Sequence, residues 1–488
     1  MSLPRPAAVV VLAAGAGTRM RSRTPKVLHR IGGRSLLGHV MAAARGLDPE
    51  RLAVVVRHER DMVAAHVAEV DATAVVVDQD DVPGTGRAVQ CALAALDAQA
   101  PLDGPLVVVA GDTPLLDADT LGELLRRHAQ EGNAVTVLTA RIDNPRGYGR
   151  ILRDEAGAVT GVVEEKDATD AQRTIDEVNT STYVFDAAVL RAAIAEVGQD
   201  NAQGEVYLTD VVAGTHARGL PVHASVVPDS KLVEGCNDRV QLAQLGAELN
   251  RRVLERHMRA GVGIVDPTTT WIDVTVDIAP DVTILPGCQL YGATTIAADA
   301  VVGPATTLTD TEVGEGAHVV RTHANLAVIG AAAEVGPFTH LRPGTRIGAR
   351  GKVGSFAETK NATLGDGAKV PHLAYVGDGD VGENANIGCG SVFANYDGAT
   401  KNRTTVGREA RIGSGTLLVA PVSVGDGAYT GAGAVIRQDV PPGALAVSSP
   451  PQRSIEGWVA SRRPGTPAAA AAEQADRGAQ QRDDEENR

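Results

Sequence analysis

Residues 364–387, LGDGAKVPHLAYVGDGDVGENANI, decide the fold of the C-terminal half of the chain. Leu364, Val370 and Val376 are six residues apart, and the same step separates Val381 from Ile387. A period of six matches neither an α-helix nor a single strand, whose periods are about 3.6 and 2. Each six-residue strand and turn is therefore one side of a triangular prism with the aliphatic side chain inside, which indicates a parallel β-helix.

The same step continues on both sides of this stretch, usually with glycine after the aliphatic residue. It separates Ile329 from Val335, Ile347 from Val353, and the successive residues Val406, Ile412, Leu418 and Val424. Between Ile387 and Val406 the step is 19 residues, and the polar segment 393–401 predicts a loop that leaves the coil. The alternative, a glycine-rich antiparallel sandwich, would not keep one period over roughly 150 residues.

Toward the N-terminus, short β-branched runs alternate with amphipathic stretches. Continuous apolar strands separated by helices are typical of a mostly parallel sheet with both faces covered. We expect strands at residues 7–12, 52–56, 74–77, 106–109 and 134–140, and helices at 36–45, 88–96 and 118–130. This pattern indicates an α/β nucleotide-binding domain.

Changes in residue pattern and composition along the chain predict four parts. Residues 1–239 form the α/β domain, and leucines at helical spacing predict a linker helix over residues 240–260. Residues 261–463 form the β-helix. Residues 464–488 are rich in Ala, Gln, Asp and Glu without an apolar period, so we expect them to be disordered.

The composition argues against several classes of protein. The chain has 488 residues and a net charge of -14, which disfavours nucleic acid and anionic membrane surfaces as partners. No run reaches the ~18 apolar residues of a membrane span, and the start lacks a convincing cleavage site. The four cysteines (Cys91, Cys236, Cys288 and Cys389) are far apart and lack metal-binding spacing. We expect a cytoplasmic protein with neither membrane insertion nor a nucleic-acid partner.

The segment after the first predicted strand carries a motif that suggests a phosphate ligand. It reads LAAGAGTRM over residues 12–20, followed by PKVL at 25–28. Glycines after a buried strand let backbone N–H groups wrap phosphate oxygens, while Arg19 and Lys26 supply countercharge. Only seven lysines stand against 39 arginines, so Lys26 and Lys166 are distinct from the generic surface charge.

Asp112 follows another predicted strand at its carboxyl end, where open α/β sheets bind ligands. A carboxylate there suits Mg²⁺, which takes one or two protein ligands besides phosphates and water. The alternative role for Asp112 is to cap the helix that follows.

The string G-x-G-T-R-M with Lys26 resembles the signature of sugar-phosphate nucleotidyltransferases. Segments 79–86, 148–150, 163–167, 179–180 and 233–237 extend the match, in order and spacing, to the uridyltransferase half of the bifunctional family that makes UDP-N-acetylglucosamine. The resemblance covers residues 7–458 and continues through the β-helix. It implies a Rossmann-like nucleotidyltransferase domain followed by a left-handed parallel β-helix, the handedness being that of the hexapeptide-repeat class.

The resemblance also implies roles in the first domain. Arg19 and Lys26 would stabilise the pyrophosphate leaving group, and Asp112 with Asn237 would hold Mg²⁺. The remaining contacts would be Leu12, Ala13, Ala14, Gly15, Gln79, Gly84 and Thr85 to the nucleotide, and Gly149, Glu164 and Asn179 to the sugar. A phosphate oxygen of N-acetylglucosamine 1-phosphate would attack the α-phosphorus of UTP in line, without a protein nucleophile. One departure is Ala110, where many relatives carry Tyr.

The β-helix carries more charged and aromatic residues than a solenoid wall needs, and this half resembles the glucosamine-1-phosphate acetyltransferase of the same family. His372 would be the general base, because neutral imidazole, with a reference pKa of about 6.5, can take the proton from an amine attacking the thioester of acetyl-CoA. Arg342 and Lys360 would bind the sugar phosphate. Tyr375 and Asn386 would contact the sugar, and the acetyl-CoA site would be lined by Cys389, Asn395, Tyr396, Ser414 and Ala432. A second departure is Ser449, where some relatives place an Arg that reaches a CoA phosphate.

Two other functions compete with a bifunctional enzyme. One is a monofunctional sugar-1-phosphate nucleotidyltransferase with a regulatory or trimerisation β-helix, and the other is a non-catalytic sensor. The clustered residues of the β-helix favour the bifunctional enzyme over both. We also expect a homotrimer, because flat prism faces with few charges bury well about a threefold axis, and the resemblance implies that each acetyltransferase site draws residues from neighbouring subunits.

Overall fold

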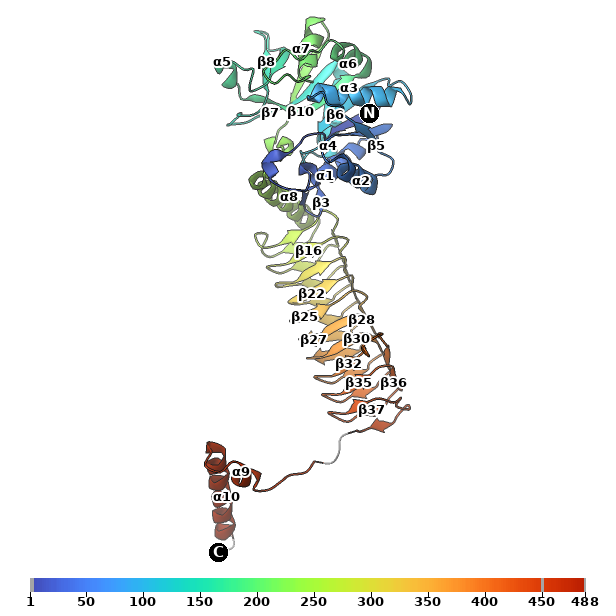
Figure 1. Ribbon diagram of the computed structural model, residues 1–488, viewed down its shortest axis with the longest axis vertical. Coiled ribbons are helices and arrows are strands. Elements are labelled where there is room, and N and C mark those ends of the chain that lie inside the picture. The colour runs from blue at the N-terminus through green and yellow to red at the C-terminus, as the bar shows by residue number, and fades with distance from the viewer. Residues whose placement is uncertain (1–3, 449–451, 487–488) are drawn as a thin grey trace. The chain divides into compact units, whose positions relative to one another are not determined.

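The computed structural model describes residues 4–448 and 452–486 (Figure 1). The chain divides into two compact units, residues 1–354 and 355–488. The first unit contains an α/β domain, a long helix and the first coils of the β-helix. The second contains further coils and the C-terminal helices. The departure at Ser449 lies outside the described residues.

The α/β domain is built on a sheet of nine strands, seven of which have the order β11-β7-β10-β6-β1-β4-β5. Of the other two, β8 pairs with β10, and β9 pairs with β8. β10 runs antiparallel to β6 and β7, and the other pairs along this path are parallel. The strands are β1 (Ala8–Leu12), β4 (Arg51–Val56), β5 (Val75–Asp78), β6 (Pro105–Ala110), β7 (Val135–Arg141), β8 (Arg150–Arg153), β9 (Val159–Val163), β10 (Glu177–Asp186) and β11 (Val222–Val226). The five strands expected from the sequence are thus present, within one residue at each end.

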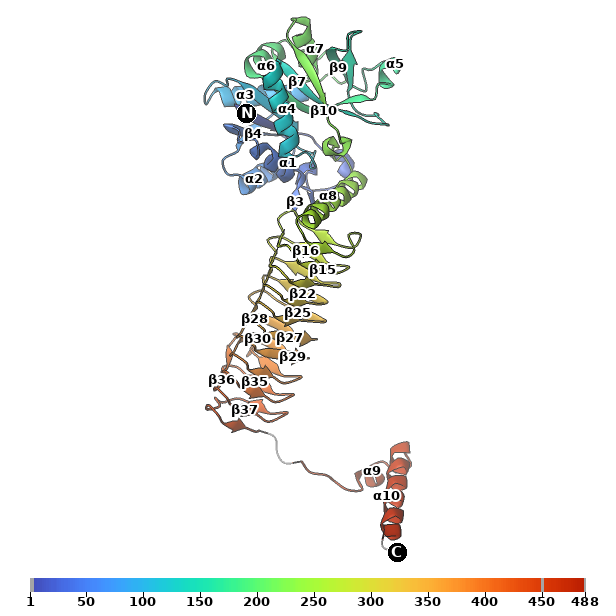
Figure 2. The same cartoon turned by 180° about the vertical axis from the view of Figure 1, so that it is seen from behind.

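Helices cover both faces of this sheet (Figures 1 and 2). Along β1, Ala8 and Val10 belong to the core under α3 and α6, whereas Val9 and Val11 belong to the core under α1 and α4. The helices are η1 (Thr18–Met20), η2 (Lys26–Leu28), α1 (Leu36–Arg45), α2 (Arg60–Val70), α3 (Thr85–Asp97), α4 (Ala118–Glu131), α5 (Asp170–Arg173), α6 (Ala187–Ile194), α7 (Asp210–Ala217) and η3 (Ser230–Val233). A small hairpin joins β2 (Arg30–Ile31) to β3 (Arg34–Ser35). Because helices cover both faces of the sheet, a ligand can bind only at the ends of its strands.

The expected linker helix is α8 (Arg239–Arg259). Its Leu245 packs with Met20, Ile31 and Cys236 of the α/β domain. Farther along, the side chain of Asn250 donates to Thr270 O at 2.8 Å and accepts from Ile272 N at 3.0 Å, on the first coil. The helix is therefore part of the first compact unit rather than a free connection.

The coils of the first unit confirm the interpretation of the six-residue period. Three parallel ladders repeat around each coil, pairing Trp271 with Gln289, Asp277 with Thr295, and Thr283 with Val301. The strands are β12 (Gly263–Ile264), β13 (Trp271–Ile272), β14 (Asp277–Ile278), β15 (Thr283–Ile284), β16 (Gln289–Tyr291), β17 (Thr295–Ile296), β18 (Val301–Val302), β19 (Thr307–Thr309), β20 (Glu312–Val313), β21 (His318–Val319), β22 (Thr322–Asn325), β23 (Val328–Ile329), β24 (Glu334–Val335), β25 (Thr339–Leu341), β26 (Arg346–Ile347) and β27 (Lys352–Ser355). The aliphatic side chains point inward, so the solenoid is consistent with a left-handed β-helix.

The second unit repeats the same arrangement and contains the expected loop. Its strands are β28 (Glu358–Leu364), β29 (Lys369–His372), β30 (Tyr375–Val381), β31 (Asn386–Ile387), β32 (Val392–Ala394), β33 (Thr404–Val406), β34 (Arg411–Ile412), β35 (Leu417–Val419), β36 (Val422–Val424), β37 (Tyr429–Thr430), β38 (Val435–Ile436) and β39 (Leu445–Ala446). Between β32 and β33 the chain leaves the coil as a small hairpin in which Tyr396 pairs with Lys401.

The C-terminal segment differs from the disorder expected for residues 464–488. It contains α9 (Trp458–Arg462) and α10 (Pro467–Glu486). Proline fits the first turn of a helix, and the alanines that follow have the highest helix propensity. The Thr466 hydroxyl accepts from Ala469 N at 3.3 Å and caps the start. The missing apolar period thus marks a helix without a buried stripe rather than the absence of a helix.

Among the described helices, none combines the length and the apolar character that crossing a membrane requires.

Candidate active sites

The carboxyl ends of β1, β5 and β6 open onto a cavity of about 410 Å³. Leu12 ends β1, while Gln79 and Asp112 follow β5 and β6, so the order of the parallel strands brings distant segments to one edge. Nine of the residues expected at the nucleotide site line this cavity: Leu12, Ala13, Ala14, Gly15, Lys26, Gln79, Gly84, Thr85 and Asp112. Ala110 lines it as well and adds only a methyl group.

The loop after β5 is held by contacts that leave one amide oxygen for a ligand. Gln79 Nε2 donates to the carbonyl oxygens of Val82 and Gly84, at 2.9 and 3.2 Å. Because both bonds use the amide nitrogen, Gln79 Oε1 is left as the acceptor of this side chain. Gly84 has a φ of 121°, and a Cβ there would lie 2.2 Å from Val206 O.

We expect Gly84→Ala to lower kcat/KM for UTP at least tenfold, which corresponds to roughly 1.4 kcal/mol. The Cβ strains the backbone and displaces Val206, which opens the loop that Gln79 holds. Steady-state assays of both half-reactions check this, with Gly214→Ala as the control because its Cβ would meet nothing within 4 Å. An unchanged kcat/KM for UTP in the Gly84 variant would contradict this role for the loop.

Four polar side chains from three distant segments meet beside the cavity. Lys26 Nζ makes an ion pair with Asp112 and lies 3.5 Å from Asn237 Oδ1. Arg19 Nη2 donates to the same Asn237 oxygen at 2.9 Å. The backbone strengthens this arrangement, because Cys236 N donates to Asp112 O at 2.9 Å. Two cations and two oxygen ligands are thus grouped where a triphosphate could enter.

The structure resolves the alternative role of Asp112. The N-cap of α4 is Asp117, whose carboxylate accepts from Thr120 N at 2.8 Å, so Asp112 does not cap this helix. In residues 4–448 and 452–486, no three His, Cys, Asp or Glu side chains are grouped as a metal site. One carboxylate and one amide oxygen fit Mg²⁺, whose other ligands are substrate phosphates and water.

The three residues expected at the sugar lie together. A Cβ on Gly149 would be 3.5 Å from Asn179 Cβ and 3.5 Å from Glu164 Oε2, and Asn179 N donates to Gly149 O at 2.8 Å. Thr209 donates to the Glu164 carboxylate at 3.3 Å. Burial raises the pKa of the Glu164 carboxyl above its usual range, and the charge of Asp210 adds to the effect. Gly149 is buried, so its turn packs closely against the segments that carry Glu164 and Asn179.

An ion pair next to the sugar residues joins two of the segments that carried the resemblance, 148–150 and 163–167, although neither partner had been given a role. Arg150 is 1% exposed, and its Nη2 lies 2.7 Å from Glu165 Oε2. Its Nη1 donates to Tyr148 O. The pair therefore ties the turn around Gly149 to the segment that holds Glu164.

Other cavity-lining residues were not expected from the sequence: Arg57, His58, Ser181 and Glu205. Arg57 and His58 follow β4, Ser181 lies in β10 and Glu205 precedes α7, and no recognisable spacing links them. Lys166, which the lysine count singled out, donates to Gln203 Oε1 at 2.6 Å.

In the second unit, four residues expected at the acetyl-transfer site occupy successive strands. Lys360 lies in β28, His372 ends β29, Tyr375 begins β30 and Asn386 begins β31. His372 is exposed, and its carbonyl accepts from Gly390 N at 3.3 Å. Arg342 follows β25 in the first unit, where its carbonyl accepts from Thr345 N at 3.2 Å.

The residues expected at acetyl-CoA form two groups in the second unit. Cys389, Ser414 and Ala432 occupy equivalent corners of successive coils, where Gly415 N donates to Cys389 O at 2.7 Å and Gly433 N donates to Ser414 O at 2.8 Å. Asn395 and Tyr396 begin the hairpin loop. A Cβ on Gly377 would lie 2.3 Å from the Tyr375 hydroxyl and 2.7 Å from Asn395 Nδ2, so this glycine makes room for both side chains.

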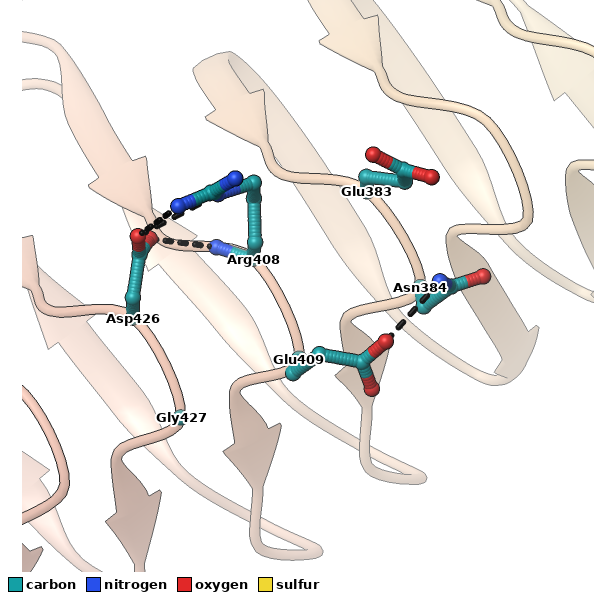
Figure 3. Close-up of a pocket in the computed structure, with 6 residues that line it drawn as sticks. All are labelled: Glu383, Asn384, Arg408, Glu409, Asp426 and Gly427. Carbon is teal, nitrogen blue, oxygen red and sulfur yellow. Dashed lines mark hydrogen bonds and ion pairs between the residues drawn. The ribbon is translucent and has the colours of Figure 1, made fainter.

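The second unit also has a groove of about 390 Å³, which lies along a different row of corners of the coils from Cys389, Ser414 and Ala432 (Figure 3). It contains none of the expected site residues. Two side-chain contacts cross it. Arg408 contacts Asp426 at 2.9 Å, and Asn384 donates to Glu409 at 2.8 Å. These pairs link adjacent coils, which is a structural role for the groove.

Comparisons with known proteins identify the family to which this chain belongs. Residues 9–178 match the model of the MobA-like NTP transferase domain. The chain is 62% identical over 470 residues to the bifunctional protein GlmU of Paenarthrobacter aurescens, covering 96% of this chain and 95% of the relative. It is 60% identical to that of Kineococcus radiotolerans, with the same coverage, and 57% identical to that of Mycobacterium tuberculosis H37Ra, covering 97% and 96%.

The fold and the two groups of residues thus define a nucleotidyltransferase joined to a hexapeptide-repeat acyltransferase. The chain belongs to the bifunctional GlmU family. It is an N-acetylglucosamine-1-phosphate uridyltransferase and a glucosamine-1-phosphate N-acetyltransferase, which together make UDP-N-acetylglucosamine for peptidoglycan precursors. Its substrates are UTP, acetyl-CoA and the two sugar phosphates. Family membership excludes a monofunctional nucleotidyltransferase and a non-catalytic sensor.

Proposed function

We propose that the cavity at β1, β5 and β6 is the uridyltransferase site, and that the cluster of Arg19, Lys26, Asp112 and Asn237 carries the chemistry. Leu12 to Gly15, Gln79, Gly84 and Thr85 bind the uridine part of UTP, and Gly149, Glu164 and Asn179 hold the sugar. Asp112 and Asn237 are the ligands for Mg²⁺, which offsets phosphate charge when it is bound. Arg19 and Lys26 neutralise the pyrophosphate that leaves. The support is the convergence of these side chains at one strand edge.

The second unit and Arg342 hold the acetyltransferase residues in this proposal. His372 takes the proton from the attacking amine, Arg342 and Lys360 bind the sugar phosphate, and Tyr375 and Asn386 contact the sugar. The corner row of Cys389, Ser414 and Ala432 and the hairpin residues Asn395 and Tyr396 hold acetyl-CoA. Three small side chains stacked on successive coils suit an extended ligand running along the prism. The functional parts are then residues 1–239, the helix 240–260 and residues 261–463, and the enzyme works in the cytoplasm.

We further propose a homotrimer formed through the β-helix. Bulky apolar side chains are exposed on the coils of both units, such as Leu326 and Phe338 in the first and Phe356 and Leu373 in the second. Exposed apolar surface of this kind marks interaction sites, and packing about a threefold axis would bury it. Acetyl transfer depends on the trimer if neighbouring subunits complete its site.

Light scattering is expected to give about 150 kDa for three chains of 50.4 kDa. Phe356→Glu places a charge in the proposed interface, so we expect smaller species and at least a tenfold loss of acetyl transfer. Uridyl transfer by the same variant is the control, because its site lies in the α/β domain, and it should stay within twofold. A monomeric wild-type chain with full acetyltransferase activity would refute the shared site.

A further inference from the structure

Three polar residues are stacked at equivalent positions of three successive coils in the second unit. Asn361, Asp378 and Asn395 are each 17 residues apart, and the register of β28 and β30 pairs Lys360 with Gly377 and Ala362 with Gly379. Asn361 Nδ2 donates to Asp378 Oδ1 at 2.7 Å. Asn395 Nδ2 donates to Asp378 Oδ2, so each carboxylate oxygen holds one amide. We call these three residues the amide ladder.

The middle residue determines how the two amides are oriented. An ionised carboxylate can only accept hydrogen bonds, so both amide nitrogens must face it and both amide oxygens must face elsewhere. Asp378 is 9% exposed. Burial alone would raise the pKa of its carboxyl, but the bonds from Asn361 and Asn395 and the charges of Lys360 and Lys401 hold this pKa below its usual range. Asp378 therefore stays charged at neutral pH.

The ladder is connected to the residues assigned to acetyl transfer. Asn395 O accepts from Asn402 N at 2.7 Å, so Asn395 closes the base of the hairpin that carries Tyr396. Its Nδ2 and the Tyr375 hydroxyl share the space left by Gly377. A change in the orientation of the Asn395 amide would therefore reach both the hairpin and Tyr375.

We propose that Asp378 is a positioning residue for acetyl transfer: its carboxylate holds the Asn395 amide nitrogen, so that the amide oxygen faces away from Asp378, and it thereby sets the base of the 395–402 hairpin. The inference rests on the proposed acetyltransferase site, and Asp378 itself touches no substrate. A buried carboxylate costs free energy unless it is fully hydrogen-bonded, and here both of its oxygens are used to orient amides.

The central test is Asp378→Gly, which removes both acceptor oxygens and suits the left-handed backbone at this position, where φ is 50°. The Asn395 amide then loses the carboxylate that fixes its orientation. We expect kcat/KM for acetyl transfer to fall at least tenfold, and uridyl transfer by the same chain to stay within twofold. The matched control is Asp380→Gly on the same strand, whose carboxylate pairs with Arg403 at the surface; it should stay within threefold.

Two further variants separate positioning from a merely structural role. Asn361→Ala removes the other bond of the ladder and leaves Asn395 held, so acetyl transfer should stay within threefold. The double variant Asp378→Gly/Asn395→Ala should be no more than twofold worse than Asn395→Ala alone, because Asp378 acts through Asn395. Thermal melting and light scattering of each variant check that the trimer and the fold are retained.

The outcomes distinguish this inference from the proposed site. If Asn395→Ala leaves acetyl transfer unchanged, the assignment of Asn395 to acetyl-CoA fails. If Asn395→Ala is impaired but Asp378→Gly is not, only the positioning role fails. A loss in Asn361→Ala equal to that in Asp378→Gly, or additive losses in the double variant, would also overturn the positioning role, because either would indicate general stabilisation of the coil.

Discussion

Asp112→Ala is expected to lower uridyl transfer by a hundredfold or more while acetyl transfer is retained. Removing the carboxylate deletes a proposed ligand of Mg²⁺ and leaves Lys26 without its ion-pair partner. Loss of one preorganised charge at a phosphoryl-transfer site costs roughly 3 kcal/mol. The measurement is UDP-N-acetylglucosamine formation from UTP at saturating Mg²⁺, with acetyl transfer by the same preparation as the internal standard.

Asp117→Ala is the matched control for this variant. Asp117 is a nearby carboxylate that caps α4, and losing such a cap costs about 1 kcal/mol of stability without touching the cavity. Its uridyl transfer should remain close to wild type. Residual activity above roughly a tenth of wild type in Asp112→Ala would rule out the metal-ligand role.

His372→Ala is expected to have the reverse effect, lowering acetyl transfer by roughly a hundredfold or more. The imidazole is exposed at the end of β29, where its removal leaves no cavity in the prism, so stability should change little. Binding of acetyl-CoA, measured by calorimetry, should be nearly unchanged, because a base acts on the amine rather than on the thioester carrier. Uridyl transfer should also be unaffected.

His318→Ala provides the comparison, because His318 is likewise an exposed histidine on a coil strand but lies outside the proposed site. Its acetyl transfer should match wild type. Near-normal acetyl transfer in His372→Ala would place the base on another residue.

The architecture was predictable because it rests on local periodicities. A six-residue step of aliphatic residues has one solution, a three-sided coil, and the pairings of Trp271, Asp277 and Thr283 match it. Continuous apolar runs such as β1 and β6 can be buried only in a sheet covered on both faces. Glycines next to such strands mark close approaches, as Gly17 shows: a Cβ there would lie 2.5 Å from Lys26 Cβ.

The helix α10 lacks an apolar stripe, so the hydrophobic period gives no sign of it. It follows instead from helix propensity and capping, which act within one turn and need no partner surface. The resemblance supplied the roles of single residues such as Glu164 and Asn386, which no spacing alone marks.

The sequence by itself determined which segments form strands, helices and coils, since the interactions that decide them lie within a few residues. Only the tertiary structure decided which polar groups meet. Asn237 joins Lys26 and Asp112 because the sheet order brings distant strand ends to one edge. Arg150 contacts Glu165, and Asp378 accepts hydrogen bonds from two amides, because neighbouring strands and coils are stacked in a fixed register. Such contacts depend on how the whole backbone folds, because a pattern along the sequence does not say how far apart two distant residues lie in space.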